Sequence, residues 1–256
     1  MTTAAFTSPE GHRLAYRCSA PRDGTDLTFV WLSGFKSDMT GTKAAALEAW
    51  AAATGHGFLA FDYSGHGQSE GVFEEGCVSV WREDALAVID ALSSGPVVLV
   101  GSSMGGWLAL LVALARPARV KGMLLIAPAP DFTENLLWAT MPEQAREEVR
   151  TRGYTLRPSQ YGEPYTITRR LIVDGRGWLL LGAPIPFEGP VRILQGMRDP
   201  DVPWQYAERL LASLTSDDVV LTLVKDGDHR LSRVQDLSRL TACCAELAAR
   251  GGDRQR

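Results

Sequence analysis

Short apolar runs alternate with stretches of helical periodicity along most of the chain. The apolar runs are continuous instead of alternating with polar residues, which is typical of strands in a parallel sheet covered on both faces. We expect strands at 4–7, 14–18, 28–32, 58–61, 97–100, 120–127, 191–195 and 219–224. The pattern between them predicts helices over 42–53, 78–92, 104–115, 204–214 and 232–249. This order predicts an α/β fold with a mostly parallel central sheet and helices on both faces.

Residues 131–190 break this alternation. They are rich in charged and turn-forming residues, with a helical stretch at 142–152 and a loop expected at 158–162. Open α/β sheets bind ligands at the carboxyl ends of their strands. We therefore expect 131–190 to form a small cap insertion over that edge, within a single domain of residues 1–256. Candidate contacts to a substrate are Leu137, Trp138 and Trp178 in this segment, and Trp204 beyond it.

The composition of the chain is consistent with this fold class and limits the kinds of binding partner that we expect. The chain has 256 residues, of which 45% are hydrophobic and 22% charged, so it can bury a substantial core. Its net charge is −4 and no segment gathers lysines, so we expect no nucleic-acid partner. The four cysteines lack metal-site spacing, so we expect free thiols and no metal. No oligomeric state is predicted.

The N-terminal residues predict the location. They show neither a basic region nor a long apolar stretch, so we expect no secretory or mitochondrial leader. No apolar run approaches the ~20 residues of a transmembrane helix, so we expect no stable membrane insertion. These features predict a cytoplasmic protein.

The sequence Gly101-Ser102-Ser103-Met104-Gly105 is the clearest candidate for chemistry. It has the form G-x-S-x-G between an expected strand and an expected helix, which places the central serine on a sharp, strained turn above the sheet edge. Glycine is needed at 101 and 105 because side chains there would collide with neighbouring backbone. The pattern predicts Ser103 as a nucleophile.

A serine nucleophile needs a base and an orienting carboxylate. Of four histidines, only His229 follows the last expected strand, so it is the candidate base. The acid is expected between them, after the strand at 191–195. We favour Asp199 because it is nearer the strand end and lies four residues before Pro203; Asp201 remains the alternative.

Backbone N–H groups are the candidate oxyanion donors. One is the N–H of Met104, directly after the nucleophile. The other comes from the loop after the strand at 28–32, where the position favours Phe35. The glycine-rich motif at 62–71 is interpreted as a turn with a structural role, packed against the edge of the sheet that carries these candidate residues.

These motifs resemble those of the α/β-hydrolase family along essentially the whole chain. Within it, the chain is similar to mitochondrial acyl-protein thioesterases that also cleave acyl glucuronides. The segments that carry the likeness are 39–44, 61–65, 101–107, 184–186, 196–197, 202–204 and 228–230. The family's triad falls on Ser103, Asp199 and His229. Ser33-Gly34 stands where many members have His-Gly.

The resemblance implies a serine hydrolase that cleaves carboxylic esters or thioesters through an acyl-enzyme. Its substrate would be a small or acylated molecule, and the chemistry would need no cofactor. Two alternatives stay open: a C–C bond hydrolase with the same triad, and a non-catalytic ligand-binding module with this fold. Serine at position 103, on the strained turn, disfavours dehalogenase and epoxide hydrolase chemistry, because relatives with those activities carry aspartate at this position.

Overall fold

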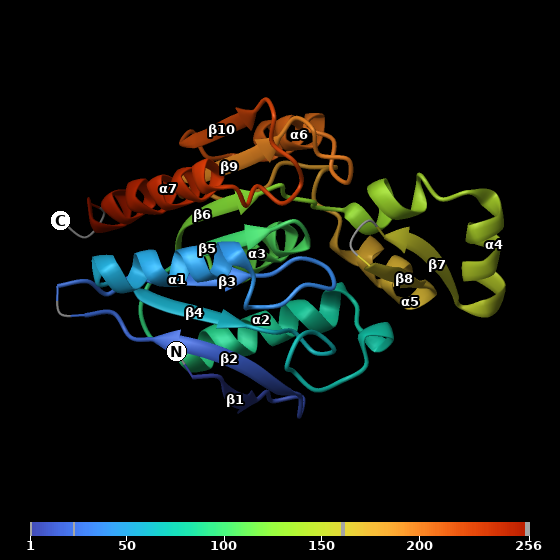
Figure 1. The fold of residues 1–256 in the computed structure, drawn as a ribbon, viewed down its shortest axis with the longest axis horizontal. Helices are drawn as coiled ribbons and strands as arrows, with labels where there is room; N and C mark the ends of the chain where they lie inside the picture. Colours follow the sequence, from blue (N-terminus) through green and yellow to red (C-terminus); the bar gives the residue numbers. More distant parts are fainter. Residues whose placement is uncertain (1, 23, 160–161, 254–256) are drawn as a thin grey trace.

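An eight-stranded sheet runs through the centre of the computed structural model, which describes residues 2–22, 24–159 and 162–253 (Figure 1). The strand order is β1-β2-β4-β3-β5-β6-β9-β10. Their bounds are β1 Ala4–Thr7, β2 Arg13–Ser19, β3 Thr28–Leu32, β4 Gly57–Phe61, β5 Val97–Ser102, β6 Val120–Ile126, β9 Val191–Gly196 and β10 Val219–Val224. β2 pairs antiparallel with β1 and β4, and the other neighbours are parallel. The predicted α/β class and mostly parallel sheet are confirmed.

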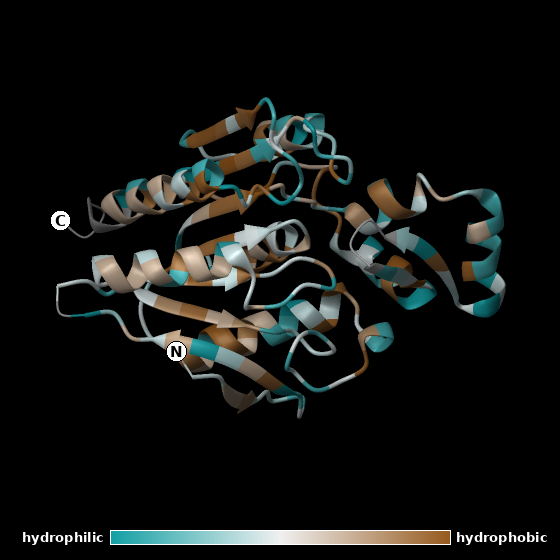
Figure 2. Ribbon diagram, viewed as in Figure 1, coloured by the Kyte–Doolittle hydropathy of each residue, from teal (hydrophilic) through white to brown (hydrophobic). Residues whose placement is uncertain are grey.

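The interior strands are buried along their whole length, which explains their continuous apolar runs. Every residue of β3, β4, β5 and β9 is buried. β5 extends past the expected end at Val100, because Gly101 and Ser102 still pair with Leu125 and Ile126 of β6. β5 therefore delivers the chain directly to Ser103 at the carboxyl edge of the sheet. Figure 2 shows the hydrophobic strands at the centre of the molecule.

Helices cover both faces of the sheet. α1 (Thr42–Thr54) and α7 (Val234–Asp253) contact each other on one face, where they contribute Leu47 and Leu240 to a buried cluster. α2 (Val78–Leu92), α3 (Met104–Ala115) and α6 (Gln205–Ser213) contribute to the cluster on the other face, which holds Trp81 and Trp107. A short helical turn, η1 (Phe73–Glu75), packs beside this second cluster.

The last helix begins later than expected. α7 starts at Val234, so Ser232 does not cap it. The Ser232 hydroxyl donates to the backbone carbonyl of Arg230 instead, at 3.1 Å. Asp236 in the first turn accepts from the Arg233 N–H and guanidinium, at 3.3 and 2.8 Å. A carboxylate that reaches back from the first turn therefore satisfies the N–H group at the start of this helix.

Residues 131–190, here called the cap segment, connect β6 to β9. In Figure 1 they project from the carboxyl edge of the sheet, away from α1 and α7. The segment contains helical elements η2 (Thr133–Trp138), α4 (Glu143–Arg152), α5 (Arg169–Gly175) and η3 (Arg176–Trp178), and an antiparallel hairpin of β7 (Tyr154–Ser159) and β8 (Gly162–Thr168). α4 matches the expected helix.

The hairpin corrects the sequence prediction at 158–162. Pro158 and Ser159 end β7 and Gly162 begins β8, whereas Gln160 and Tyr161 lie outside the described residues. These strands lack a continuous apolar run because they do not join the central sheet. Proline at 158 and the pairing irregularity between Arg157 and Ser159 further weaken the strand pattern.

Candidate active site

Ser103 occupies a strained turn between β5 and α3. Its φ of 55° and ψ of −119° are unfavourable for a residue with a side chain. The turn is held by the backbone: the Ser103 N–H donates to Ile126 at 2.9 Å, and the Ser103 carbonyl accepts from Gly106 and Ala129 at 2.9 and 3.1 Å. Strain maintained by three such bonds is typical of a functional position.

Two glycines make this turn possible. A Cβ atom on Gly101 would lie 2.3 Å from the carbonyl oxygen of Gly105. One on Gly105 would lie 2.0 Å from the carbonyl oxygen of Leu32. Both carbonyl oxygens belong to the backbone of α3 or β3, which cannot move aside. A side chain at either glycine would therefore collide with the backbone, as expected from the sequence.

Asp199 lies in the turn after β9, with its carboxylate fully buried. Oδ2 accepts from His229 Nδ1 at 2.7 Å and from Gln195 Nε2 at 3.1 Å. Oδ1 accepts from the backbone N–H groups of Asp201 and Val202 at 2.8 and 2.9 Å. Four donors fix this carboxylate. Because it can only accept from His229, it makes Nδ1 the protonated nitrogen and leaves Nε2 as the acceptor.

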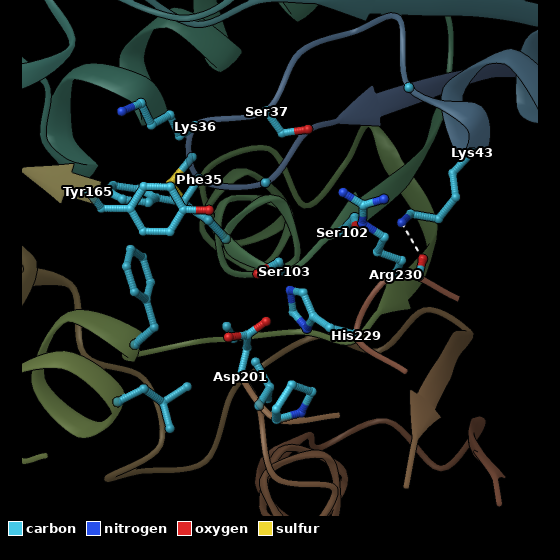
Figure 3. Close-up of a pocket in the computed structure, with 18 of the residues that line it drawn as sticks. Phe35, Lys36, Ser37, Lys43, Ser102, Ser103, Tyr165, Asp201, His229 and Arg230 are labelled. Atoms are coloured by element: carbon cyan, nitrogen blue, oxygen red, sulfur yellow. Dashed lines mark hydrogen bonds between the residues drawn. The ribbon is translucent and has the colours of Figure 1, made fainter. Parts of the chain in front are cut away.

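His229 lies in the loop after β10 and meets Ser103 in one pocket. Its side chain is 17% exposed, and both residues line the pocket at the carboxyl edge of the sheet. Figure 3 shows the His229 ring next to Ser103. The structure thus brings together the three residues that the sequence assigned as nucleophile, base and acid, from three different strand ends.

Asp201 also lies beside His229, on the pocket wall (Figure 3). In the described residues, Asp199, Asp201 and His229 form the one group that offers three converging metal-ligand atoms, within 4.8 Å of one another. The 2.7 Å bond between Asp199 Oδ2 and His229 Nδ1 already uses two such atoms, so an ion bound through them would have to break it. The geometry suits an acid–histidine pair better than a metal centre.

The loop after β3 approaches the nucleophile from the other side. A Cβ atom on Gly34 would lie 3.4 Å from both the Ser102 carbonyl oxygen and Ser103 Cβ. The next residue, Phe35, lines the pocket, as does Met104 at the first position of α3. Neither of their N–H groups donates a hydrogen bond within the described part of the chain. Two donors that have no partner among the described residues, one in a loop and one at the start of α3, therefore adjoin Ser103, as an oxyanion site requires.

The pocket in front of Ser103 has a volume of about 600 Å³ and two unlike walls. Figure 3 shows Phe35 and Tyr165 on one side of Ser103, and Lys43 and Arg230 on the other. The apolar wall consists of Phe35, Phe132, Leu136, Leu137, Tyr165 and Ile167. The polar wall includes Ser37, Asp38, Thr42, Lys43 and Arg230. Ser103 lies where the two walls meet, a position suited to a substrate with an apolar and a polar part.

The four predicted substrate contacts are only partly brought to this pocket. Leu137 lines it, but Trp138, Trp178 and Trp204 do not. Trp138 is half-buried against the core cluster, and its ring lies among the guanidinium groups of three arginines, the nearest 5.3 Å from the ring centre. Trp178 packs under Arg82 and donates to the Ser79 hydroxyl at 2.8 Å. Trp204 immediately precedes α6. Cation–π contacts with arginines therefore engage the rings of Trp138 and Trp178 outside the pocket.

Several pocket residues were not predicted from the sequence as part of the site. Tyr165 and Ile167 come from the unpredicted hairpin, and Phe132 follows β6. Lys43 at the start of α1 donates to the Arg230 carbonyl at 2.5 Å, and burial lowers the pKa of its ammonium group to about 8. Only the fold brings these residues to the pocket, because they are distant in sequence from Ser103, Asp199 and His229.

Comparisons with known proteins agree with this arrangement. The sequence model described as the alpha/beta hydrolase family matches residues 29–239. The human palmitoyl-protein thioesterase ABHD10, mitochondrial, is 38% identical over 249 residues, covering 96% of this chain and 80% of that protein. The protein of the same name from Bos taurus is likewise 38% identical, with the same coverage.

Solved structures give the same result. A protein from Agrobacterium vitis S4 superposes with a TM-score of 0.93 at 46% identity, covering 96% of this chain and 98% of that chain. The alpha/beta hydrolase domain-containing protein 10 from mouse superposes with a TM-score of 0.88 at 35% identity, with the same coverage. The resemblance predicted from the motifs is confirmed.

The expectation of a cytoplasmic location is wrong. Five relatives that match most of the chain carry the word mitochondrial in their names, and these names contradict the expectation. The prediction rested on the N-terminal residues, which form no part of the folded site. Within the described ranges, no helix combines the length and apolar character needed to cross a bilayer.

The family model covers most of the chain, and relatives more than 30% identical align with nearly all of it. These matches agree with the central sheet, the strained serine turn and the order of the strand ends. The chain therefore belongs to the α/β-hydrolase family and is a hydrolase.

Proposed function

We propose that this chain hydrolyses acyl thioesters and esters, with Ser103, His229 and Asp199 as its catalytic triad. The observation that carries the proposal is the Asp199–His229 bond of 2.7 Å beside Ser103, at the floor of a pocket with an apolar wall. The names of the relatives favour a long-chain acyl thioester, such as a palmitoylated cysteine, as the substrate class.

In the proposed acylation step, Ser103 Oγ attacks the acyl carbon while its proton passes to His229 Nε2. Asp199 stabilises the resulting imidazolium through Nδ1. The N–H groups of Phe35 and Met104 donate to the oxyanion of the tetrahedral intermediate. Collapse breaks the carbon–sulfur or carbon–oxygen bond, and His229 returns its proton to the leaving group. Ser103 then carries the acyl group as an ester.

In the deacylation step, a water molecule takes the place of the leaving group. His229 Nε2 accepts its proton as the water oxygen attacks the acyl carbon, and the same two N–H groups bind the second oxyanion. When this intermediate collapses, the proton returns to Ser103 Oγ and the carboxylic acid leaves. His229 thus alternates between base and acid in both steps.

We further propose that the cap segment belongs to a single domain with the sheet and binds the acyl chain. Leu136 and Leu137 in η2, with Tyr165 and Ile167 in β8, form the outer part of the apolar wall. Each buried methylene group contributes about 0.8 kcal/mol, so a chain lying along this wall would gain affinity with length. The polar wall, with Lys43 and Arg230, is left for the leaving group.

A fluorophosphonate probe tests the nucleophile, because it reacts with activated serines. We expect labelling of the wild-type protein and hydrolysis of palmitoyl and octanoyl thioesters. Ser103→Ala should lose both, and Ser238→Ala, which changes an exposed serine on α7, should keep both. A wild-type protein that is neither labelled nor active would contradict the proposal and favour the non-catalytic binding module.

A further inference from the structure

Two loops meet behind the candidate oxyanion donor. One follows β3 and contains Phe35; the other follows β4 and contains the glycine-rich motif at 62–71. The Met39 N–H donates to Asp62 Oδ1 at 2.7 Å, and the Lys36 N–H donates to His66 Nε2 at 3.2 Å. The second bond falls on the residue directly after Phe35, so it acts at the part of the loop that adjoins Ser103.

The surroundings of His66 define its protonation. The residue is 3% exposed and packs edge-on against the rings of Tyr63, Phe73 and Trp81, with centroids 5.6, 5.1 and 5.1 Å away. Burial lowers the pKa of its imidazole to about 4, so the ring is neutral at neutral pH. A neutral imidazole has one donor and one acceptor nitrogen.

The partners of His66 also settle which nitrogen carries the proton. Nδ1 lies 3.3 Å from the Ser64 carbonyl, which can only accept, so Nδ1 is the donor. Nε2 faces the Lys36 N–H, which can only donate, so Nε2 is the acceptor. Both partners are backbone groups, and the ring therefore has one orientation and one tautomer.

Lys36 is the strained residue of its turn. Its φ of 54° lies in the left-handed region, which is unfavourable for a residue with a side chain. The turn is closed by the Ser37 N–H, which donates to the Gly34 carbonyl at 3.1 Å. The Lys36 ammonium lies 5.6 Å from the ring centres of both Phe73 and Tyr165. Since rotating the peptide between Phe35 and Lys36 would break the bond to His66, that bond resists relaxation of the turn.

We propose that His66 is a positioning residue for the oxyanion site: its Nε2 holds the Lys36 N–H and thereby keeps the Phe35 N–H directed at the reacting carbonyl next to Ser103. His66 touches no substrate and transfers no proton. Its effect falls on the transition state, because the Phe35 N–H is needed most when negative charge develops on the carbonyl oxygen. This inference rests on the proposed hydrolase function.

His66→Gln and His66→Met form a matched pair for the test. The two side chains have the same length and similar shape, but only the glutamine oxygen is a strong acceptor for the Lys36 N–H, since the methionine sulfur accepts weakly. The readouts are kcat and KM with an octanoyl thioester, the inhibition constant of an octyl trifluoromethyl ketone, which forms an oxyanion on the serine, and the melting temperature. Loss of a whole oxyanion donor typically costs 100- to 1000-fold in kcat, so displacing one should cost less.

We expect His66→Met to lower kcat about 10- to 100-fold with KM little changed, and to raise the inhibition constant of the ketone by a similar factor. His66→Gln should retain most of the wild-type kcat and most of the affinity for the ketone. Should the methionine variant fail to fold, His66→Asn replaces it, because its shorter amide cannot reach Lys36. Unchanged kcat and ketone affinity in the acceptor-free variant would overturn the proposal. Equal losses in both members of the pair would also overturn it, because they would indicate packing alone.

The same measurements separate this inference from the proposed function. A wild-type protein with no thioesterase activity and no affinity for the ketone would contradict the hydrolase proposal itself. An active wild-type protein whose two variants behave alike would contradict only the role of His66.

Discussion

Two carboxylates near His229 have different surroundings, although they lie only two residues apart. Asp199 is fully buried and accepts four hydrogen bonds, one of them from His229. Asp201 lines the pocket, and its backbone N–H is one of the four donors to Asp199. The sequence favoured Asp199 over Asp201 as the acid, because Asp199 is nearer to the end of the preceding strand. The burial that distinguishes the two carboxylates comes from how β9 and its turn fold.

Asparagine substitutions should separate the two aspartates. Asp199→Asn keeps the shape but allows His229 to adopt the wrong tautomer, so we expect kcat to fall about 10³- to 10⁴-fold. Asp201→Asn should cost much less, because it leaves the bond to Nδ1 intact. Steady-state kinetics with one thioester substrate, on variants with matched melting temperatures, gives the comparison. The reverse ranking would assign the acid role to Asp201.

Lys43 predicts a pH dependence of stability. Its pKa is about 8 in the folded protein, chiefly because of burial, and 10.5 is the ordinary value expected on unfolding. Between these pH values the unfolded state binds more protons, so this group makes the folded state more stable as pH rises. The gain is complete above pH 10.5 and is lost as pH falls through 8.

The matched variant for this prediction is Lys43→Met, which keeps the length of the side chain and removes the titration. Other groups titrate in the same range, so the quantity to measure is the difference in free energy of unfolding between the two proteins, from urea denaturation at pH 8 and pH 10. At pH 10 the free energy of unfolding of the wild-type protein should be higher, relative to that of the variant, than at pH 8. A constant or opposite difference would contradict the assignment.

At the scale of elements, the parallel strands place the site and the cap segment shapes it. Ser103, Asp199 and His229 follow β5, β9 and β10, whose parallel order directs all three to one edge. This was predictable, because continuous apolar runs and the serine turn are local signals. The hairpin of β7 and β8 was not, because its side chains pack against segments distant in the sequence, such as Tyr165 against Phe35. Which residues of η2 line the pocket could not be predicted either: Leu137 lines it, whereas Trp138 does not.

The contrast between Leu137 and Trp138 gives a test of the apolar wall. Leu137→Ala should lower kcat/KM for a palmitoyl thioester about 10-fold while leaving an acetyl thioester nearly unchanged, because the lost contact is to the distal chain. Trp138→Ala, at the adjacent position that does not line the pocket, should keep the wild-type dependence on chain length. Rates across a series from acetyl to palmitoyl give the profile. A profile that Leu137→Ala leaves unchanged would remove the cap wall from the acyl site.

At the scale of the whole molecule, the pocket gathers segments from most of the chain. Its lining runs from Trp31 after the first strands to Ser232 before the last helix. Sequence motifs identified Ser103, Asp199 and His229 as candidates, because short segments such as Gly101–Gly105 mark the ends of strands. They did not identify the polar wall or the bond between His66 and Lys36, because each joins segments that only the folded sheet brings together. The cellular location was wrongly predicted for a different reason, since it does not depend on the fold.

The most direct test of the central claim is to trap the acyl-enzyme. Wild-type protein mixed with a palmitoyl thioester, quenched in acid within milliseconds and digested, should show by mass spectrometry a palmitoyl group on the peptide that contains Ser103. The adduct should be absent from Ser103→Ala and should form much more slowly in Asp199→Asn. Hydrolysis of the thioester without an adduct, or with the acyl group on another residue, would contradict the proposed mechanism.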